Sequence, residues 1–369
     1  MGEYVRAATL ASAVLERWPG AQVRFLLSRA APYAASVKFA TTWLESSPTF
    51  HSREVIEVLR EFRPHLVVFD NAGRTAQLAA ARRLGARVIF VSARRRQRAR
   101  AFRLRWMRLI DEHWIAYPAQ LAGELGALER LKLRLLARPH VRYLDVVMAR
   151  PAAGRAAELL RSLGLEGRPF VLVVPGGGTG IRGQKGVLAA FEEAAVRLAG
   201  DGVAVLYAGG PGAAVTAATG TPASSRSEPT PPQARIQYAG GFPQADLAAL
   251  LASAEVVLLN GGSTLLQAIA CHAACVAAPI SGDQPERIRR CAAAGLVRPA
   301  PPEPDAMARA VRDLLEQPSA RAQLRARTET FALADGVRLA LDAMARYIEP
   351  PGGAATDASL VRGGPACPT

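Results

Sequence analysis

The stretch 255–280 constrains the fold of this chain most, because its pattern predicts a strand, a turn, a helix and a second strand in succession. Glu255–Leu259 is dominated by valine and leucine, which is typical of a buried parallel strand. Asn260–Thr264 turns the chain, Leu265–His272 has helical spacing, and Ala274–Ile280 is the second apolar run. A β-α-β unit of this kind predicts a parallel sheet.

The turn of this unit contains Gly261 and Gly262, followed by Ser263 and Thr264. A helix that begins at such a turn leaves unpaired backbone N–H groups and the positive end of its dipole, about half a charge, above the sheet. A diphosphate fits such a site without a metal or a lysine. Many α/β proteins use a Gly-Gly turn only to redirect the chain, so the hypothesis depends also on three polar residues that follow: Gln267, Asp283 and Gln284.

Strand and helix patterns alternate through the rest of the chain about every 20–25 residues, which is typical of β-α units around a parallel sheet. The length of 369 residues allows two α/β domains, and we place the boundary near Pro151. The predicted organisation is an N-terminal lobe (1–150), a C-terminal lobe (151–348) and a disordered tail (349–369), with a flexible insertion at Ala213–Gln233. The strands expected in the first lobe are Gln22–Leu27, His65–Phe69, Arg87–Val91, Glu112–Ala116 and Val141–Leu144, and those expected in the second are Phe170–Val174, Val203–Ala208 and Ile236–Ala239, besides the two named above.

The first lobe is expected to lack its first strand. Gly2 leads directly into a helical pattern that ends near Trp18, whereas a doubly wound sheet places a strand and a glycine turn before its first helix. Either a truncation or misplaced start has removed that strand, or the sheet has an unusual edge.

A second glycine-rich loop, residues 175–183, follows the strand Phe170–Val174. It predicts another group of backbone N–H donors at the same edge of the sheet. The candidate anion-binding residues of this loop are Gly176, Gly177, Gly178, Thr179 and Arg182, although a merely solvated Arg182 fits the sequence equally well.

Three absences in the sequence suggest a cytoplasmic protein. No apolar run approaches the roughly 18 residues that span a bilayer, and the start of the chain does not resemble a signal peptide. The cysteines do not form a secreted-type framework. Cys271, His272 and Cys275 invite a metal hypothesis, but no second ligand pair appears elsewhere, so we interpret the cysteines as small buried residues and expect no metal.

The positive charge is concentrated in the first half, where 26 Lys and Arg face 12 Asp and Glu, while the chain as a whole carries +15. Within residues 94–108 lie eight arginines, with Phe102, Trp106, Leu109 and Ile110 at helical spacing. This segment is a solvated helix packed on the sheet, or a surface for phosphate or anionic lipid, with Arg95, Arg98 and Arg105 as candidate contacts. Nucleic acid is disfavoured because no recognition module or aromatic platform accompanies the arginines.

The pattern resembles the GT-B-fold glycosyltransferases, and is most similar to the group that holds the N-acetylglucosaminyltransferase of peptidoglycan lipid synthesis and the UDP-sugar hydrolase of pseudaminic acid synthesis. The sequences GGSTLLQ and PISGDQ carry the resemblance in the second half. In that family the Gly-Gly-Ser-Thr turn holds the donor diphosphate, an acidic residue one helical turn later holds the ribose, and the later pair contacts the donor sugar. Gly241-Phe242 resembles the segment near the nucleotide base.

Two positions depart from the family pattern. Gln267 replaces the acidic ribose-binding residue, and an amide offers one acceptor oxygen where a carboxylate offers two. The sequence GEYVRAATLA resembles the family's first loop, but Glu3 stands where the relatives have the histidine that is their favoured catalytic base. A glutamate can act as a base if its pKa is suitable, and the alternative is a frayed terminal residue.

The resemblance implies glycosyl transfer from a nucleotide diphosphate sugar, most simply UDP-linked, to a glycan or lipid-linked acceptor held by the basic first lobe. The absence of an Asp-x-Asp motif agrees with metal-independent catalysis and with no cofactor. Two alternatives remain open, a nucleotide-sugar hydrolase in which water replaces the acceptor, and a catalytically inactive GT-B binding subunit. If the arginine segment meets lipid, the protein is peripheral on the inner face of the membrane.

Overall fold

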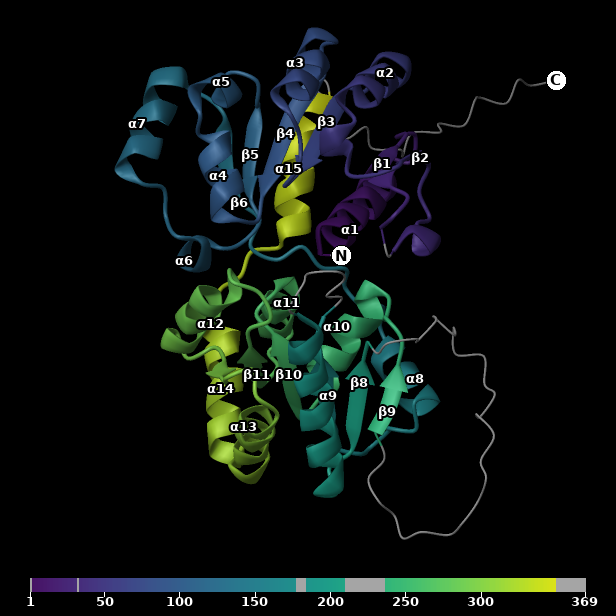
Figure 1. The fold of residues 1–369 in the computed structure, drawn as a ribbon, viewed down its shortest axis with the longest axis vertical. Helices are drawn as coiled ribbons and strands as arrows, with labels where there is room; N and C mark the ends of the chain where they lie inside the picture. Colours follow the sequence, from purple (N-terminus) through teal and green to yellow (C-terminus); the bar gives the residue numbers. More distant parts are fainter. Residues whose placement is uncertain (1, 32, 177–183, 210–235, 350–369) are drawn as a thin grey trace, which may run out of the picture.

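The protein has two α/β lobes, which Figure 1 shows one above the other. The structure is a computed structural model and describes residues 2–31, 33–176, 184–209 and 236–349. The loop residues 177–183, the segment 213–233 and residues 350–369 of the predicted tail lie outside these ranges.

The first lobe contains parallel strands in two separate sheets. The pair β1-β2 forms one sheet, and the other has the order β3-β4-β5-β6. The strands are β1 (Phe25–Ser28), β2 (Thr41–Leu44), β3 (Leu66–Asp70), β4 (Arg87–Ser92), β5 (Glu112–Ile115) and β6 (His140–Tyr143). The helices are α1 (Gly2–Arg17), α2 (Ser52–Phe62), α3 (Thr75–Arg83), α4 (Arg95–Ala101), α5 (Leu104–Met107), α6 (Ala119–Ala122) and α7 (Ala127–Leu136), with short 3₁₀ turns at η1 (Ala34–Ser36) and η2 (Pro48–Phe50).

The second lobe has one continuous parallel sheet of order β12-β11-β10-β7-β8-β9. Its strands are β7 (Val171–Val174), β8 (Val205–Ala208), β9 (Ile236–Ala239), β10 (Val256–Asn260), β11 (Cys275–Ala278) and β12 (Arg298–Pro299). Its helices are α8 (Arg155–Ser162), α9 (Gln184–Gly200), α10 (Gln244–Ser253), α11 (Ser263–Ala270), α12 (Gln284–Ala293), α13 (Pro304–Glu316) and α14 (Pro318–Thr330). The three parallel sheets, two in the first lobe and one in the second, confirm the predicted two Rossmann-like lobes.

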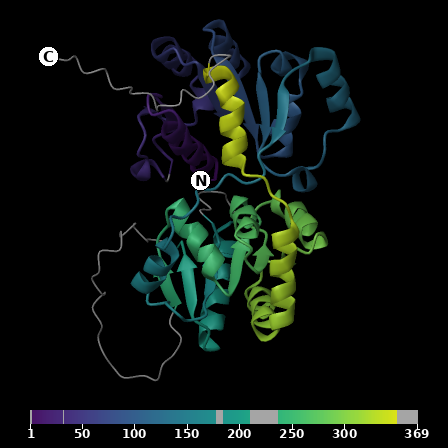
Figure 2. The same ribbon diagram turned by 180° about the vertical axis from the view of Figure 1, so that it is seen from behind.

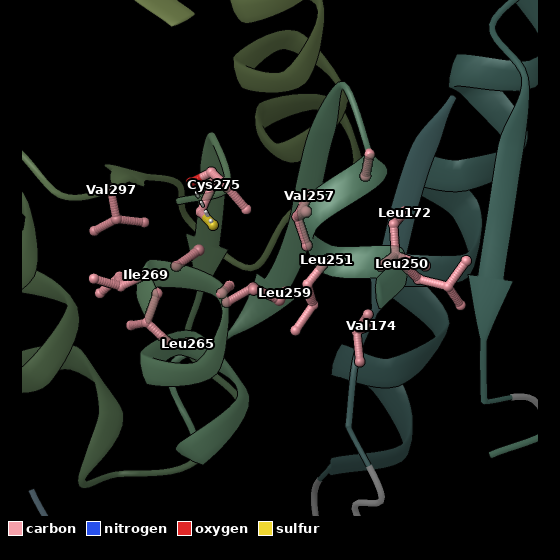
Figure 3. Close-up of a cluster of buried hydrophobic side chains, with 14 of the residues drawn as sticks. Leu172, Val174, Leu250, Leu251, Val257, Leu259, Leu265, Ile269, Cys275 and Val297 are labelled. Atoms are coloured by element: carbon pink, nitrogen blue, oxygen red, sulfur yellow. Dashed lines mark hydrogen bonds between the residues drawn. The ribbon is translucent and has the colours of Figure 1, made fainter. Parts of the chain in front are cut away.

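Helices cover both faces of the second sheet, so its central strands are apolar throughout. Alternate residues of β7 enter different cores: Leu172 and Val174 pack with Leu259 and Leu265, while Val173 packs against Phe191 on the other face. Figure 3 shows the first of these clusters, with side chains from β7, β10, β11, α10 and α11 converging. Burial on both faces is the reason why the sequence shows unbroken valine and leucine runs here.

The last helix, α15 (Gly336–Ile348), returns to the first lobe. It packs beside α1, and Ala340 and Met344 join a core cluster with Leu10 and Trp114. The sequence predicted one helix over Ala320–Tyr347, but the structure divides it at residues 331–335 because the chain there crosses between the lobes.

Candidate functional site

Two glycine turns leave the second sheet side by side. Strands β7 and β10 are neighbours in register, with Val174 opposite Leu259, so the turns that follow them emerge at the same carboxyl edge. This confirms the predicted placement for the part of the first turn that the structure describes, which ends at Gly176. Gly177, Gly178, Thr179 and Arg182 lie outside the described residues, and their roles stay predictions.

Asn260, the last residue of β10, joins the two turns. Its Nδ2 donates to the Pro175 carbonyl oxygen (2.6 Å), and its Oδ1 accepts from the Gly262 backbone N–H (2.6 Å). The side chain is buried, with 5% of its surface exposed, so both bonds form where water cannot replace them and each is costly to lose. From the sequence, Asn260 was expected only as a residue of the turn.

Gln284 supports the same turn from α12. Its Oε1 accepts from the backbone N–H groups of Gly261 (3.2 Å) and Ile280 (2.8 Å), and its Nε2 donates to Asn260 Oδ1 (3.3 Å). The carboxamide is buried and engaged at both ends. Gln284 was predicted to contact a donor sugar; that contact stays a prediction, and the role visible here is to hold the turn.

The glycines of both turns are required by the close approach of Asn260. Gly176 has a φ of +89°, and a Cβ at this position would collide with the Asn260 amide nitrogen. A Cβ at Gly262 would lie 2.6 Å from Asn260 Oδ1. The two turns can therefore meet around the Asn260 side-chain amide only if positions 176 and 262 carry no side chain.

The first turn of α11 faces a pocket between the lobes. Helix geometry leaves the backbone N–H groups of Ser263 and Thr264 without intrahelical acceptors, and the helix dipole makes this end positive. The lining residues come from both lobes: Gly2, Val5, Arg6, Ala116, Tyr117, Asp145, Val146 and Val147 from the first, and Ser263, Leu266 and Gln267 from the second. The arrangement suits an anionic group held between a helix N-terminus and the opposite lobe.

The wall opposite α11 is the beginning of α1. A Cβ built on Gly2 would lie 3.1 Å from Ser263 Oγ, so the two lobes touch at this point. Glu3 belongs to the first turn of α1, and its Oε1 accepts from Asn71 Nδ2 (2.9 Å). Arg6 is buried and forms an ion pair with Asp70, with Nε donating to Oδ2 at 2.9 Å. Glu3 is exposed and is not among the residues that line the pocket, but the residue after β3 anchors it beside Gly2, which differs from the frayed terminus considered as the alternative.

Gln267 and Phe242 lie near the same cleft edge. Gln267 lines the pocket one helical turn after Ser263, and its Nε2 donates to Gln244 Oε1 (3.1 Å) on α10. Phe242 follows β9, and its ring packs against the core cluster beneath the sheet edge. The ribose and base contacts predicted for these residues stay predictions.

Arg287 links the lobes and was missed in the sequence. It donates to the Gly261 carbonyl oxygen and to Asp283 Oδ2 (3.1 Å), and its guanidinium lies 4.2 Å from the ring centroid of Tyr117 in the first lobe. Burial raises the pKa of Asp283, but hydrogen bonds from Ser281 and Arg287 and the charge of Arg287 outweigh it and lower the pKa below its usual value. The i,i+4 spacing of Asp283 and Arg287 was the available sequence signal.

The arginine segment forms two short helices, α4 and α5, rather than one. Phe102 and Trp106 are 3% and 5% exposed, so the apolar stripe packs into the first lobe, as in the alternative of a helix packed on the sheet, and these two rings are not available to a lipid interface. Trp106 Nε1 donates to Thr75 Oγ1 (3.1 Å), which ties the ring to α3. Arg98 pairs with Glu129 (2.8 Å) and donates to the Gly123 carbonyl oxygen (2.6 Å), whereas Arg95 and Arg105 are exposed.

The cysteines of the second lobe are buried or partly buried. Burial raises the pKa of Cys271 to about 11 and that of Cys291 to about 12, so both thiols stay protonated at neutral pH. Among the described residues no cluster of His, Cys, Asp and Glu could hold a metal ion. Likewise, none of the helices in the described ranges is long and apolar enough to cross a membrane.

Comparison with protein families gives one match, in which residues 161–331 fit the model of glycosyl transferases group 1. This range covers most of the second lobe and includes both glycine turns. Comparison with the curated proteins finds none that matches.

Solved structures share the whole architecture at low sequence identity. A UDP-glucosyltransferase from Polygonum tinctorium has a TM-score of 0.61 at 14% identity, over 94% of this chain and 96% of that chain. CalG4, the calicheamicin glycosyltransferase, has a TM-score of 0.57 at 16% identity, over 94% and 95%. A candidate UDP-N-acetylglucosamine 2-epimerase from Listeria monocytogenes has a TM-score of 0.57 at 13% identity, over 94% of both chains. The fold is therefore GT-B, and residues 161–331 of its second lobe match the model of glycosyl transferases group 1.

Proposed function

We propose that the protein transfers a sugar from a nucleotide diphosphate sugar, most simply a UDP-sugar, to a glycan or lipid-linked acceptor. The observation that carries this proposal is the pair of turns held together by Asn260, with the α11 N-terminus open to the pocket between the lobes. The matched domain, residues 161–331, supports the same reaction class. Fold likeness alone leaves the reaction open, because the similar structures include both transferases and a candidate epimerase.

In this proposal the diphosphate lies at the backbone N–H groups of Ser263 and Thr264. Bond cleavage at the sugar places additional negative charge on the leaving diphosphate, and preorganised backbone dipoles stabilise that charge without reorganisation. Glu3, held by Asn71 on the opposite wall, is the candidate base that accepts the proton of the acceptor hydroxyl. Gln267 would contact the ribose and Phe242 the base, while Asp283, with its lowered pKa, would stay ionised to accept hydrogen bonds from sugar hydroxyls.

The donor site is tested by a charge placed at the α11 N-terminus. We expect UDP to raise the Tm of the wild-type protein equally with Mg²⁺ and with EDTA, because backbone dipoles need no metal. Ser263→Glu should abolish the shift, since its carboxylate takes the position of the phosphate, and a carboxylate at this end of the helix does not destabilise the fold.

Ser263→Gln is the matched control, because it adds the same bulk without the charge and should keep most of the shift. Gly262→Leu should also abolish the shift by displacing Asn260, whereas Gly200→Leu, where a Cβ meets open space at the end of α9, should not. A UDP shift that requires Mg²⁺, or one that Ser263→Glu retains, contradicts the proposal.

In this proposal the basic first lobe binds the acceptor, and it does so at the surface of a membrane. Helix α7 has no buried residue, and Leu128, Leu131 and Leu135 are 63%, 51% and 75% exposed at i, i+3 and i+7 on one face. Lys132 beside this stripe donates to the Phe102 carbonyl oxygen (3.1 Å), which places α7 against the arginine segment. Exposed leucines beside exposed Arg95, Arg103 and Arg105 match an anionic bilayer surface.

Vesicle co-sedimentation tests this location. Binding to vesicles with phosphatidylglycerol is expected, with little binding to phosphatidylcholine alone, and added salt should weaken it by screening. Two triple variants should reduce vesicle binding without changing the Tm shift caused by UDP. One replaces Leu128, Leu131 and Leu135 by glutamine, and the other replaces Arg95, Arg103 and Arg105 by glutamine. The charge-matched control replaces three arginines of the second lobe, Arg161, Arg289 and Arg309, by glutamine. This variant should bind the vesicles as the wild type does. Equal retention on neutral and anionic vesicles contradicts the membrane location.

Two other functions share the donor site. A nucleotide-sugar hydrolase would release free sugar from the donor with water alone, and an inactive subunit would bind UDP without consuming any UDP-sugar. Assays of UDP release with and without acceptor distinguish them. The exposed basic and apolar surface of the first lobe favours transfer, because a hydrolase needs no large acceptor.

A further inference from the structure

A second cavity lies at the edge of the first lobe opposite the cleft. Its volume is about 140 Å³, and its lining comes from the amino ends of parallel strands and from the last helix: Arg87, Asp111, Ala137, Arg138, His140 and Tyr347. Strands β4, β5 and β6 begin at this edge, whereas residues that follow β5 and β6 line the pocket between the lobes. The cavity is therefore separate from the candidate donor site.

Three arginines surround one buried carboxylate in this cavity. The Asp111 side chain is 3% exposed, and its oxygens accept from Arg82 Nη1 at 2.7 and 2.8 Å and from the Val88 backbone N–H at 2.8 Å. Arg87 and Arg138 reach only Oδ1, at 3.5 and 3.4 Å, beyond the usual range of about 2.7–3.2 Å. Because one carboxylate carries one charge, it leaves two of the three guanidinium charges without compensation.

Arg87 and Arg138 have hydrogen-bond donors to spare. Each guanidinium carries five N–H donors. Arg87 lies 5.4 Å from the ring centroid of Tyr347, and Arg138 has one further contact, at 3.5 Å, with the Arg108 carbonyl oxygen. In the described part of the chain, Asp111 is the only carboxylate that either arginine reaches. Most of their N–H groups are therefore available to an anion in the cavity.

The neighbouring carboxylate, Glu112, does not supply the missing negative charge. Its side chain is fully buried and accepts from Arg142 at 3.0 Å, from Arg346 at 2.6 Å and from the Tyr347 hydroxyl at 3.1 Å. This carboxylate is thus itself shared by two arginines. Five arginines and two carboxylates meet around this end of the lobe, which leaves an excess of three positive charges. Such an excess beside a partly enclosed space attracts anions.

We propose that this cavity binds a phosphate group and that Arg87 and Arg138 are its main ligands. Both guanidinium groups reach the same oxygen of Asp111, so one tetrahedral oxyanion can accept hydrogen bonds from both. The planar fork of a guanidinium matches two phosphate oxygens, and the imidazole of His140 adds an N–H donor in its neutral or charged form. A cavity of about 150 Å³ holds a molecule of benzene size, so the volume suits a phosphate group. The proposal does not depend on the proposed function.

A phosphate group bound here would also join the last helix to the sheet. Tyr347 lines the cavity from α15, while Arg87 and Arg138 stand at the starts of β4 and β6. Figure 2 shows that α15 is the helix that returns from the second lobe. We therefore expect bound phosphate to slow the hydrogen exchange of amides 344–348 in the last turn of α15.

Binding of inorganic phosphate at neutral pH tests the site, measured by isothermal titration calorimetry and thermal shift against sodium chloride of equal ionic strength. The parent protein carries Ser263→Glu, which blocks the other candidate anion site at the α11 N-terminus. We expect saturable binding and a saturable rise in Tm, and a Kd at least roughly tenfold higher in Arg87→Gln/Arg138→Gln. Stabilisation by exclusion of phosphate from the surface is common to all variants and does not saturate.

Two further variants make the result specific. Arg53→Gln/Arg60→Gln removes two exposed arginines from α2 in the same lobe and should bind phosphate as the parent does. Arg87→Lys/Arg138→Lys keeps both charges, so it should fold even if the glutamine variant does not. It should still weaken binding roughly three- to tenfold, because an ammonium group lacks the planar fork.

A phosphate monoester, glycerol 3-phosphate, identifies the source of the group. Tighter binding than inorganic phosphate would support the site with a phosphorylated metabolite as occupant, and weaker binding would support it with the free ion. The inference is overturned if no saturable binding occurs, if the Arg87 and Arg138 variants bind phosphate as the parent does, or if the α2 variant loses as much affinity as they do.

Discussion

The two lobes end corresponding strands with the same residue type and use it differently. Asn71 follows β3 in the first lobe, and Asn260 ends β10 in the second. Asn260 is buried and bonds to Pro175, Gly262 and Gln284, so it holds two turns of one sheet together. Asn71 accepts from Ala93 N–H (2.7 Å) and donates to Glu3, so it joins its strand edge to α1.

This difference follows from the continuity of the strands beside each asparagine. The second sheet is continuous, so a second turn lies beside Asn260 and can be bonded to it. The first lobe's strands are interrupted next to β3, and the Asn71 amide nitrogen bonds to a side chain on a helix instead of a neighbouring turn. The second lobe consequently holds its two turns together by buried and partly buried hydrogen bonds, while the first lobe holds the Glu3 carboxylate by one exposed hydrogen bond.

The largest loss of stability is expected when these two asparagines are replaced, one at a time, and this tests the comparison directly. Asn260→Ala should lower the free energy of unfolding by about 3 kcal/mol, because it leaves a buried N–H and a buried carbonyl without partners. It should also abolish the UDP-dependent Tm shift. Urea denaturation and the thermal shift with UDP measure the two effects.

The matched variant in the first lobe is Asn71→Gly, which keeps the left-handed backbone at φ 53°. It should cost about 1 kcal/mol, because the lost bonds are partly exposed, and UDP should still bind. Similar losses in both variants, or an Asn260→Ala protein that binds UDP normally, would show that the two residues are equivalent and the comparison mistaken.

The general fold could be predicted from the sequence because burial on both faces imposes a local pattern. Residues 256–259 of β10 and all of Val171–Val174 are apolar, and the turns after these strands contain glycine because Asn260 approaches both. The strand β2 (Thr41–Leu44) was missed, since its pattern of partial burial carries two threonines and a tryptophan. Helix α7 was missed for a related reason: it has no buried face to impose an apolar period toward the core.

The partners of the candidate site residues could not be predicted, because they depend on which segments meet in space. Nothing local indicates that Gln284 bonds to Gly261, or that Arg287 lies over Tyr117 of the other lobe. The same applies to Phe102 and Trp106, whose spacing predicts an apolar stripe without saying whether it faces the core or the solvent. Periodicity identifies a face, and only the fold decides what covers it.

A buried histidine makes the first lobe the more acid-sensitive one. Burial, and to a lesser degree the charge of Arg98, lower the pKa of His113 to about 3, and its Nε2 lies 2.8 Å from Ser92 Oγ. Between this pKa and the ordinary value of about 6.5, the unfolded chain binds a proton that the folded chain does not. Stability therefore falls as pH drops below about 6.5, and the His113 contribution at pH 5 is about 2 kcal/mol.

Urea denaturation at pH 7 and pH 5 checks this effect. His113→Gln should show a smaller loss between the two pH values than the wild type, and the exposed control His140→Gln should show the same loss as the wild type. At pH 5, hydrogen exchange should increase first in β4 and β5, before the strands of the second lobe, whose histidine, His272, is exposed. An unchanged pH dependence in His113→Gln would mean that His113 is protonated in the folded protein.

The smallest effect is expected at the contact between the lobes. Tyr117→Leu removes the ring that lies 4.2 Å from the Arg287 guanidinium, while Arg287 keeps its bonds to Gly261 and Asp283. A partly buried cation–π contact is worth about 0.5–1 kcal/mol, so the affinity for UDP should fall roughly two- to fivefold if closure of the lobes contributes to binding. Isothermal titration calorimetry measures this change, and Tyr117→Phe, which keeps the ring, should bind as the wild type does. If Phe and Leu at position 117 weaken binding equally, the hydroxyl rather than the ring makes the contact, and the lobes are held together by Arg290, which donates to the Leu121 carbonyl oxygen at 3.0 Å.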